Sequence, residues 1–381
     1  MQRLANDGRI HILHVVGRLD IGGAESRIMD LYRNIDREQI QFDFMQHTSD
    51  ICAYQNEVES MGGHVYHVPR FRIYNILQYR KSWKQFMQAH PEIQIVHGHM
   101  TSVAGLYLPI AKKYGNAYTI AHARSAGVDK GIKGFVTNIF RRNLSEKCNQ
   151  CFTCSDLAGV AVFGERAVQE GKVKMIPNAI SVGRFEYQEQ KRNELREALG
   201  IEKDAYVIGH VGRFNAVKNH AYMLDIFECC YRRDSKCRMM FVGDGGLKEE
   251  MMKKAKDKGL EKYIIFTGNQ KNVVDYYQAM DFFILPSFYE GLPGTAIEAQ
   301  ATGLRGILSD RVTKEALVTD LMKQMSIDLP ADEWAKEILA KIVYQRTSHV
   351  EQVREAGYDV EEQAERLSEF YLGVCNNENR D

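Results

Sequence analysis

Two glutamates separated by seven residues are the clearest candidates for chemistry in this chain. Glu290 ends a predicted loop after the apolar run 282–287, and Glu298 lies in the first turns of the helix predicted to follow. Carboxylates accept hydrogen bonds from the neutral hydroxyls of ribose and hexose. An acidic residue near a helix N-terminus is also stabilising without any ligand. The pair must therefore be interpreted together with the residues around it.

Two further groups lie in positions that suit a phosphate. Gly291 and Gly294 would expose their backbone amides where the helix begins, so these amides could meet a phosphate or a sugar hydroxyl. Arg213 and Lys218 follow the apolar run 205–212. Arginine grips phosphate oxygens in a fork and lysine supplies a point charge, which could also stabilise a leaving group. They could be solvated surface cations, but their position directly after a strand favours function.

A glycine pair follows the first apolar run of the chain. Gly22 and Gly23 come after residues 10–16 and before a predicted helix at 24–35. Glycine lets the backbone approach an anion closely, and the helix would offer free N–H groups. A tight strand-to-helix turn explains the same residues equally well.

These loops must be positioned by a regular alternation of apolar runs and amphipathic stretches. Alternation of this kind predicts parallel strands with helices on both faces. The chain therefore reads as two doubly wound α/β domains with a boundary near 176–204, and as helical from 332 to 372. Strands are expected at 10–16, 41–46, 64–68, 93–99, 117–123 and 150–154, with a strand and a loop within 173–180, and then at 205–212, 237–246, 263–268, 282–287 and 304–310.

Composition fits this architecture. The chain has 381 residues, 44% of them hydrophobic and 26% charged, which excludes a disordered or collagen-like chain. Fifty Lys and Arg balance fifty Asp and Glu, which argues against a nucleic-acid binder. The polar start of the chain resembles no signal peptide, so we expect a cytoplasmic protein with reduced thiols. Cys148, Cys151 and Cys154 have metal-like spacing but no fourth ligand, and we expect them in the core.

The motifs together resemble family 4 retaining glycosyltransferases of the GT-B architecture. The resemblance rests on GHVGRFNAVKNH, FVGDGG, YQAMDFFILPSFYEGLPGTAIEAQATG and ILSD in the second half, and on HVVGRLDIGGAE, IVHGH, IAHAR and IPNAI in the first. Within that family the chain is similar to bacterial enzymes of capsular and exopolysaccharide assembly. The resemblance implies three parts: an acceptor-binding domain at 1–178, a nucleotide-sugar donor domain at 179–355, and a helix at 356–381 that crosses back to the first domain.

The resemblance also implies a role for each candidate residue. Arg213 and Lys218 would bind the donor diphosphate, Glu290 would lie near the transferred sugar, and Glu298 would bind the ribose hydroxyls. His122 would face the transferred sugar. Asn269 to Val273 would form the loop that holds the nucleobase, and the loop of Leu292, Pro293, Gly294 and Thr295 would hold the diphosphate and the hexose. Gly22 and Gly23 would form the N-terminal turn that closes on the phosphates. The family commonly has valine where this chain has Gly294, which leaves the donor sugar open.

Histidines and basic residues need separate interpretation. His14, His97, His99, His122 and His210 lie at or near predicted strand ends, and clustered imidazoles could suggest a metal site. The resemblance implies that no metal or other cofactor is needed, and we expect most of them to be cleft-lining or core residues.

One block of the chain is strongly basic. Residues 70–147 hold 13 Lys and Arg against 3 Asp and Glu, a net charge of +10. Two basic amphipathic helices are expected there, near 77–88 and 130–142, which could be ordinary surface helices. Aromatic residues such as Tyr79 and Trp83 interleave with the cations of the first, and Lys130, Lys133 and Arg141 flank apolar residues such as Ile132 in the second. For an enzyme acting on a lipid-linked acceptor, contact with an anionic membrane surface is favoured.

We therefore predict a metal-independent, retaining hexosyltransferase. It would move a hexose or N-acetylhexosamine from a UDP-sugar to a lipid-linked saccharide in surface polysaccharide biosynthesis, at the inner face of the cell membrane. Three alternatives stay open: a UDP-sugar epimerase of the same fold, a sugar phosphorylase with pyridoxal phosphate, and a non-enzymatic sugar-nucleotide sensor. No nucleic-acid partner is expected.

Overall fold

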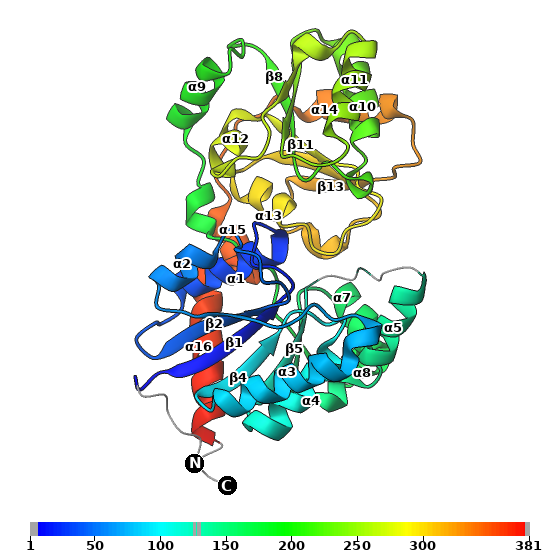
Figure 1. The fold of residues 1–381 in the computed structure, drawn as a ribbon. Coiled ribbons are helices and arrows are strands. Elements are labelled where there is room, and N and C mark those ends of the chain that lie inside the picture. The colour runs from blue at the N-terminus through cyan, green and yellow to red at the C-terminus, as the bar shows by residue number, and fades with distance from the viewer. Residues whose placement is uncertain (1–6, 125–126, 128–130, 378–381) are drawn as a thin grey trace. The chain divides into compact units, whose positions relative to one another are not determined.

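The computed structural model describes residues 7–124, 127 and 131–377, which fall into two compact units. The first combines the described residues of Met1–Ala179 with those of Val360–Asp381, and the second is Ile180–Asp359 (Figure 1). Each unit is a parallel sheet with helices on both faces, which confirms the predicted doubly wound architecture. The chain returns to the first unit at residue 360. Tyr358, two residues earlier, still forms hydrogen bonds within the second unit. Its carbonyl accepts the Ile180 N–H, and its hydroxyl donates to the Glu315 carbonyl.

The sheet of the first unit has seven strands in the order β3-β2-β1-β4-β5-β6-β7, and every pair is parallel. Its central strands are buried on both faces, which explains why they read as continuous apolar runs. The strands are β1 (Ile10–Val16), β2 (Ile40–Gln46), β3 (Val65–His67), β4 (Ile93–Gly98), β5 (Tyr118–Ala123), β6 (Gln150–Thr153) and β7 (Val173–Met175).

Two apolar cores, one on each face of this sheet, hold its helices. One core contains residues of α1 (Gly23–Asn34), α2 (Gln55–Ser60) and the last helix, α16 (Val360–Asn377). Helices α1 and α16 pack against each other, although more than three hundred residues separate them in sequence (Figure 1). The other core contains residues of α3 (Ile76–Ala89), α4 (Ala104–Gly115), α6 (Leu144–Lys147) and α7 (Asp156–Phe163). Two more helices complete the unit: α5 (Gly131–Arg141) and α8 (Glu165–Gln169).

The sheet of the second unit has six parallel strands in the order β10-β9-β8-β11-β12-β13. The edge strand β13 was not predicted, because its sequence MKQM has no apolar run and most of its side chains are only partly buried. The strands are β8 (Tyr206–Val211), β9 (Cys237–Val242), β10 (Ile264–Phe266), β11 (Phe282–Leu285), β12 (Arg305–Ser309) and β13 (Met322–Met325).

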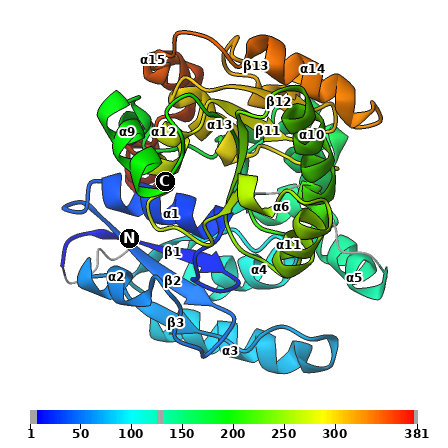
Figure 2. The ribbon, with the colours of Figure 1, turned by 90° about the horizontal axis from the view of Figure 1, so that it is seen from above.

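Helices again cover both faces of this sheet. On one face, α10 (His220–Arg233) packs against α14 (Ala331–Lys341) and shares a core with α11 (Lys248–Asp257) (Figure 2). The other core contains residues of α12 (Val273–Ala279), α13 (Gly294–Ala301) and α15 (Val350–Val353), with α9 (Glu189–Ala198) packed beside it. Helices α14, α15 and α16 account for most of the segment 332–372 that was expected to be helical. The expectation is wrong at 342–349, which form a loop between α14 and α15, and Gly357 interrupts the turn Arg354–Tyr358 with a φ of 84°.

The cysteine prediction is also confirmed. Cys148, Cys151 and Cys154 are 7%, 2% and 2% exposed and belong to one apolar core of the first unit. All eight cysteines are free. Among the described residues, no helix has both the length and the apolarity needed to cross a membrane.

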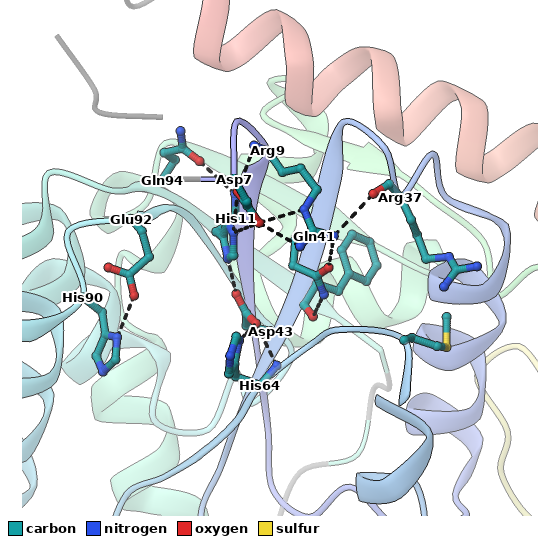
Figure 3. Close-up of polar contacts among 12 residues, drawn as sticks. Asp7, Arg9, His11, Arg37, Gln41, Asp43, His64, His90, Glu92 and Gln94 are labelled. Atoms are coloured by element: carbon teal, nitrogen blue, oxygen red, sulfur yellow. Dashed lines mark hydrogen bonds and ion pairs between the residues drawn. The ribbon is translucent and has the colours of Figure 1, made fainter. Parts of the chain in front are cut away.

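A buried ionic network joins β1 to β2 in the first unit (Figure 3). His11 Nδ1 lies 2.7 Å from the Oδ2 atom of the fully buried Asp43, and His11 Nε2 lies 3.2 Å from Asp7 Oδ2. The second oxygen of Asp43 accepts the backbone N–H of His64 at 2.8 Å. Burial alone would lower the pKa of His11, but the carboxylates of Asp43 and Asp7 outweigh it and raise that pKa above its usual 6.5.

This raised pKa predicts a pH-dependent contribution to stability. The charged form of His11 stabilises the fold fully below the unfolded pKa, and this contribution is lost as the pH rises through the folded pKa. We expect Asp43→Asn to lower the stability by roughly 1 to 3 kcal/mol near about pH 6, and by less at about pH 9. Thermal unfolding of both proteins across this range measures the difference.

His64→Asn is the matched control, because the side chain of His64 contacts the same carboxylate but is 63% exposed. It should change stability little at any pH. A penalty for Asp43→Asn that stays constant across the pH range would contradict a charged His11.

Candidate functional site

The loop after β8 is held against the loop after β11 in the second unit. Asn215 caps the short 3-10 turn Ala216–Lys218 by accepting the Lys218 N–H at 3.1 Å. The backbone N–H of Phe288 donates to the Val217 carbonyl at 2.8 Å, and Asn219 Nδ2 donates to the Pro286 carbonyl at 3.2 Å. The strands β8 and β11 are neighbours in the sheet, so their carboxyl ends bring the two loops together.

The hydrogen bonds between these two loops place two of the predicted residues in direct contact. Lys218 Nζ lies 2.6 Å from Glu290 Oε1, and the two side chains are only 15% and 17% exposed. The hydroxyl of the buried Ser287 donates to the same carboxylate oxygen at 3.2 Å. The result is a partly buried ion pair, in which an anionic ligand could replace the carboxylate as the partner of the lysine.

The second glutamate has a different environment. Glu298, in the second turn of α13, is 4% exposed, and Tyr277 of α12 donates its hydroxyl hydrogen to Glu298 Oε2 at 2.8 Å. A buried carboxylate held by a neutral donor keeps capacity to accept further hydrogen bonds from hydroxyls.

The N-terminus of α13 lies in the same loop as Glu290. Its N-cap is Pro293, which offers no side-chain acceptor, and the loop residue Leu292 is buried. The Thr295 hydroxyl is buried and has no hydrogen-bond partner among the described residues. Gly294 begins the helix, so its first N–H groups and this hydroxyl are donors that suit an anion or a sugar oxygen.

The other predicted residues of this unit are less closely connected to the ion pair. Arg213 is exposed and has no ion-pair partner among the described residues. Asn269 is exposed in the loop after β10, and Val273 is the first residue of α12. The same helix carries Tyr277, so it connects this loop to Glu298.

In the first unit, the glycine pair begins α1 as predicted. Gly22 is the N-cap, and a Cβ there would lie 2.6 Å from Glu25 Oε2, whereas a Cβ on Gly23 would meet nothing within 4 Å. A cavity of about 930 Å³ opens beside this turn. Its polar lining includes Asp20, Glu25, His47, Thr48, His67 and Arg70.

His122 lies at the end of β5 within a cluster of buried imidazoles. Its Nδ1 atom is 3.0 Å from His97 Nε2, and its Nε2 atom has no hydrogen-bond partner among the described residues. His14 Nδ1 is 2.9 Å from His99 Nε2. Burial lowers the pKa of His14 to about 3 and the pKa values of His97, His99 and His122 well below 6.5. These imidazoles are therefore neutral at physiological pH.

The cluster has metal-like proximity but not metal-like geometry. One ring nitrogen each from His14, His97 and His99 lies within 4.8 Å of the others. The rings stack, however: those of His14 and His99 are inclined by 6°, and those of His97 and His99 by 23°. Nitrogen lone pairs lie in the ring plane, so stacked rings do not aim at one ion. The prediction that most of these histidines belong to the core is confirmed for His14, His97, His122 and His210, which are at most 1% exposed.

Sequence reasoning missed several partners of the predicted residues. Ser287 and Tyr277 contact the two glutamates, and neither was singled out. Ser287 could have been suspected, because it lies in the same loop three residues before Glu290. Tyr277 could not, because only the packing of α12 on α13 brings it to Glu298.

Comparisons with known proteins identify the class. Over 98% of each chain, the structure is similar to Anabaena Alr3699/HepE in complex with UDP, with a TM-score of 0.72 and 16% identity. It is also similar to sucrose-phosphate synthase from Thermosynechococcus elongatus, with a TM-score of 0.76 and 16% identity over 97% of this chain and all of that one. The two doubly wound units have the GT-B fold of glycosyltransferases.

The family follows from sequence. Residues 21–184 match the model for Glycosyltransferase Family 4, and residues 191–360 match the model for Glycosyl transferases group 1. Putative glycosyltransferase EpsF of Bacillus subtilis is 30% identical, over 96% of this chain and 97% of its own. Capsular polysaccharide biosynthesis glycosyltransferase CapH of Staphylococcus aureus is 24% identical, over 95% and 99%. The chain belongs to the group 1 glycosyltransferases with a family 4 N-terminal half.

Proposed function

We propose that this glycosyltransferase moves a hexose or N-acetylhexosamine from a UDP-sugar to a lipid-linked saccharide, with retention, in surface polysaccharide biosynthesis. The observation that carries the proposal is the Lys218–Glu290 ion pair at 2.6 Å, in a loop that continues into the N-terminus of α13. A cation beside free helix N–H groups suits a diphosphate, and the carboxylate beside it suits the hydroxyls of a sugar.

The known relatives support the choice of donor and acceptor. HepE has been crystallised with UDP and with UDP-glucose. A relative from Escherichia coli, 26% identical over 62% of this chain, is a UDP-Gal:alpha-D-GlcNAc-diphosphoundecaprenol alpha-1,3-galactosyltransferase. CapH acts in capsular polysaccharide biosynthesis. A UDP donor and a diphosphate-linked acceptor are therefore the substrates to test first.

In the proposed mechanism, the chain's own cations replace a metal ion. Lys218 and Arg213 would neutralise the charge that develops on the leaving diphosphate, together with the N-terminus of α13. Glu298 would accept hydrogen bonds from the ribose hydroxyls, and Glu290 would orient the transferred sugar. The donor phosphate would take the proton of the attacking acceptor hydroxyl on the face that the diphosphate leaves.

A nucleotide panel tests the donor class. We expect UDP to raise the thermal unfolding midpoint, and GDP and ADP to leave it unchanged; a ligand at about 100 times its dissociation constant adds ~2.7 kcal/mol. Chelation with EDTA should change neither the UDP shift nor turnover. If GDP or ADP stabilises the protein instead, the UDP assignment is wrong; if EDTA abolishes turnover, so is the metal-independent mechanism.

Exchanging the ion-pair residues tests the site. Glu290→Gln should reduce transfer by roughly 100-fold or more, yet retain or improve UDP affinity because Lys218 loses its competing carboxylate. Lys218→Gln should weaken UDP binding by roughly 10-fold or more, because a charged hydrogen bond is lost. Titration calorimetry measures the affinity, and UDP release in the presence of acceptor measures transfer.

Glu250→Gln is the matched control, because Glu250 is an exposed glutamate on α11 of the same unit. Full transfer by Glu290→Gln would contradict the site assignment. Conversion of the donor sugar without any acceptor would favour the epimerase alternative.

We also propose that the basic part of the first unit contacts an anionic membrane surface. Arg72, Arg80 and Lys81 are exposed along α3 and the turn before it, near Ile73, Tyr74 and Leu77, which are 59%, 84% and 80% exposed. Two expectations need correction. Tyr79 and Trp83 are fully buried, and Arg141 is partly buried and donates to Thr101 Oγ1 at 3.0 Å, so none of the three is a free surface group. Lys130 and the side chains of Ile132 and Lys133 lie outside the described residues.

Replacing Arg72, Arg80 and Lys81 together by glutamine should weaken binding to vesicles that contain phosphatidylglycerol. Each basic residue near an anionic surface contributes about 1 kcal/mol, so three lost charges predict a roughly 100-fold lower partition coefficient. The control replaces Lys253, Lys256 and Lys262, which are exposed in the second unit, by glutamine. The net charge changes by the same amount in both variants. Equal binding by the two variants, measured by vesicle sedimentation, would contradict this membrane face.

A further inference from the structure

The partly buried guanidinium of Arg124 has no anionic hydrogen-bond partner among the described residues. Arg124 follows β5 directly, and its Nε atom donates to His99 Nδ1 at 3.3 Å, while Nη1 donates to Asn178 Oδ1 at 2.9 Å. The third nitrogen, Nη2, is buried and has no hydrogen-bond partner among the described residues. Both partners are neutral side chains, so the charge of the guanidinium is not compensated by a contact.

The histidine cluster fixes this arrangement. Because His99 Nδ1 accepts from the arginine, the proton of the neutral imidazole must be on Nε2, from which it donates to His14 Nδ1 at 2.9 Å. Burial lowers the pKa of each histidine of the cluster, and the charge of Arg124 lowers it further. The stacked rings therefore hold Arg124 with neutral acceptors and cannot supply a counter-charge.

The surroundings favour an anion from outside the chain. Burial lowers the pKa of Arg124 only to about 10, so the group remains charged at neutral pH. Glu25 acts on it electrostatically but forms no ion pair with it. A buried charge without a partner is unfavourable, and a guanidinium edge is well shaped for a phosphate. Helix α1, which carries Glu25 in its first turn, begins at the glycine pair of the same unit.

We propose that Arg124 binds a diphosphate ester, as an anion subsite of the first unit. This inference rests on the proposed function only for the source of the diphosphate, which is either the nucleotide-sugar donor or the lipid-linked acceptor. His99 and Asn178 are positioning residues that direct Nη2 toward the ligand. The free Nη2 atom would donate to a phosphate oxygen in a charge-assisted hydrogen bond.

Binding measurements with three probes test the subsite: UDP, geranyl diphosphate and inorganic pyrophosphate. We expect Arg124→Gln to lower the affinity for pyrophosphate, and the affinity for one of the two diphosphate esters, by roughly 10- to 100-fold. Arg124→Lys keeps the charge without the fork and should give an intermediate loss. Arg142→Gln, an exposed arginine of the same unit, is the matched control and should bind like the wild type.

The pattern of losses identifies the source of the diphosphate. If Arg124→Gln weakens the binding of UDP but not of geranyl diphosphate, Arg124 contacts the donor. If it weakens the binding of geranyl diphosphate but not of UDP, Arg124 contacts the acceptor. Uridine binding should be unchanged in every variant. Unchanged affinity of a folded Arg124→Gln for all three probes would overturn the inference, and should this variant not fold, unchanged binding by Arg124→Lys would do so.

The inference and the proposed function can fail separately. Wild-type protein that binds pyrophosphate through Arg124 but does not bind UDP would keep the subsite and contradict the UDP donor. Wild-type protein that binds UDP through Lys218 but shows no dependence on Arg124 with any probe would keep the donor and overturn the subsite.

Discussion

Both candidate sites depend on a break in strand order. In the second unit, the order β10-β9-β8-β11 places β8 beside β11, and in the first, β3-β2-β1-β4 places β1 beside β4. At such a position the loops after the two central strands leave on opposite faces of the sheet, and ligands bind beyond the carboxyl ends. Lys218 and Glu290 come from the loops after β8 and β11. His14 lies in β1, and His99 directly follows β4.

The two units treat charge in opposite ways at this position. In the second unit a lysine and a glutamate neutralise each other at 2.6 Å, with a serine hydroxyl on the same oxygen. In the first, Arg124 is surrounded by imidazoles that burial keeps neutral and by the amide of Asn178. An ion pair can exchange one anion for another at small cost, whereas an uncompensated guanidinium gains a partner only from a ligand. The Lys218–Glu290 ion pair of the second unit suits a site in which a ligand anion replaces the carboxylate in turn. The uncompensated Arg124 of the first unit suits a site that is neutralised only when an anion binds.

Sequence predicts the fold well where burial is continuous and poorly where it is not. The central strands, such as Ile10–Val16 and Tyr206–Val211, are buried on both faces, and their apolar sequences predicted them correctly. The edge strand Met322–Met325 was not predicted, because only one of its four side chains is buried and its sequence therefore has no apolar run. Loops directly after recognised strands could be named as candidate sites, which is why Lys218 and Glu290 were predicted.

Contacts made by tertiary packing could not be predicted in the same way. Arg124 was not predicted as a site residue, because nothing in the motif IAHAR indicates that its Nη2 atom is buried without a hydrogen-bond partner among the described residues. Tyr277 lies in an ordinary amphipathic helix, and only packing of α12 against α13 turns its hydroxyl toward Glu298. The histidines were noticed as a group, but their stacking, which argues against a metal ion, depends on the strand register.

The basic block shows how the structure changes an argument from composition. Its aromatic residues were counted with its cations as one amphipathic surface, yet Tyr79 and Trp83 pack in the core with no exposed area. Near α3, the exposed apolar side chains are Ile73, Tyr74 and Leu77, at the start of the helix and in the turn before it. Three exposed side chains bury little area in a bilayer, so charge attraction must supply most of the membrane affinity of this face. Binding of this kind weakens steeply with salt, whereas binding by inserted aromatic residues would not.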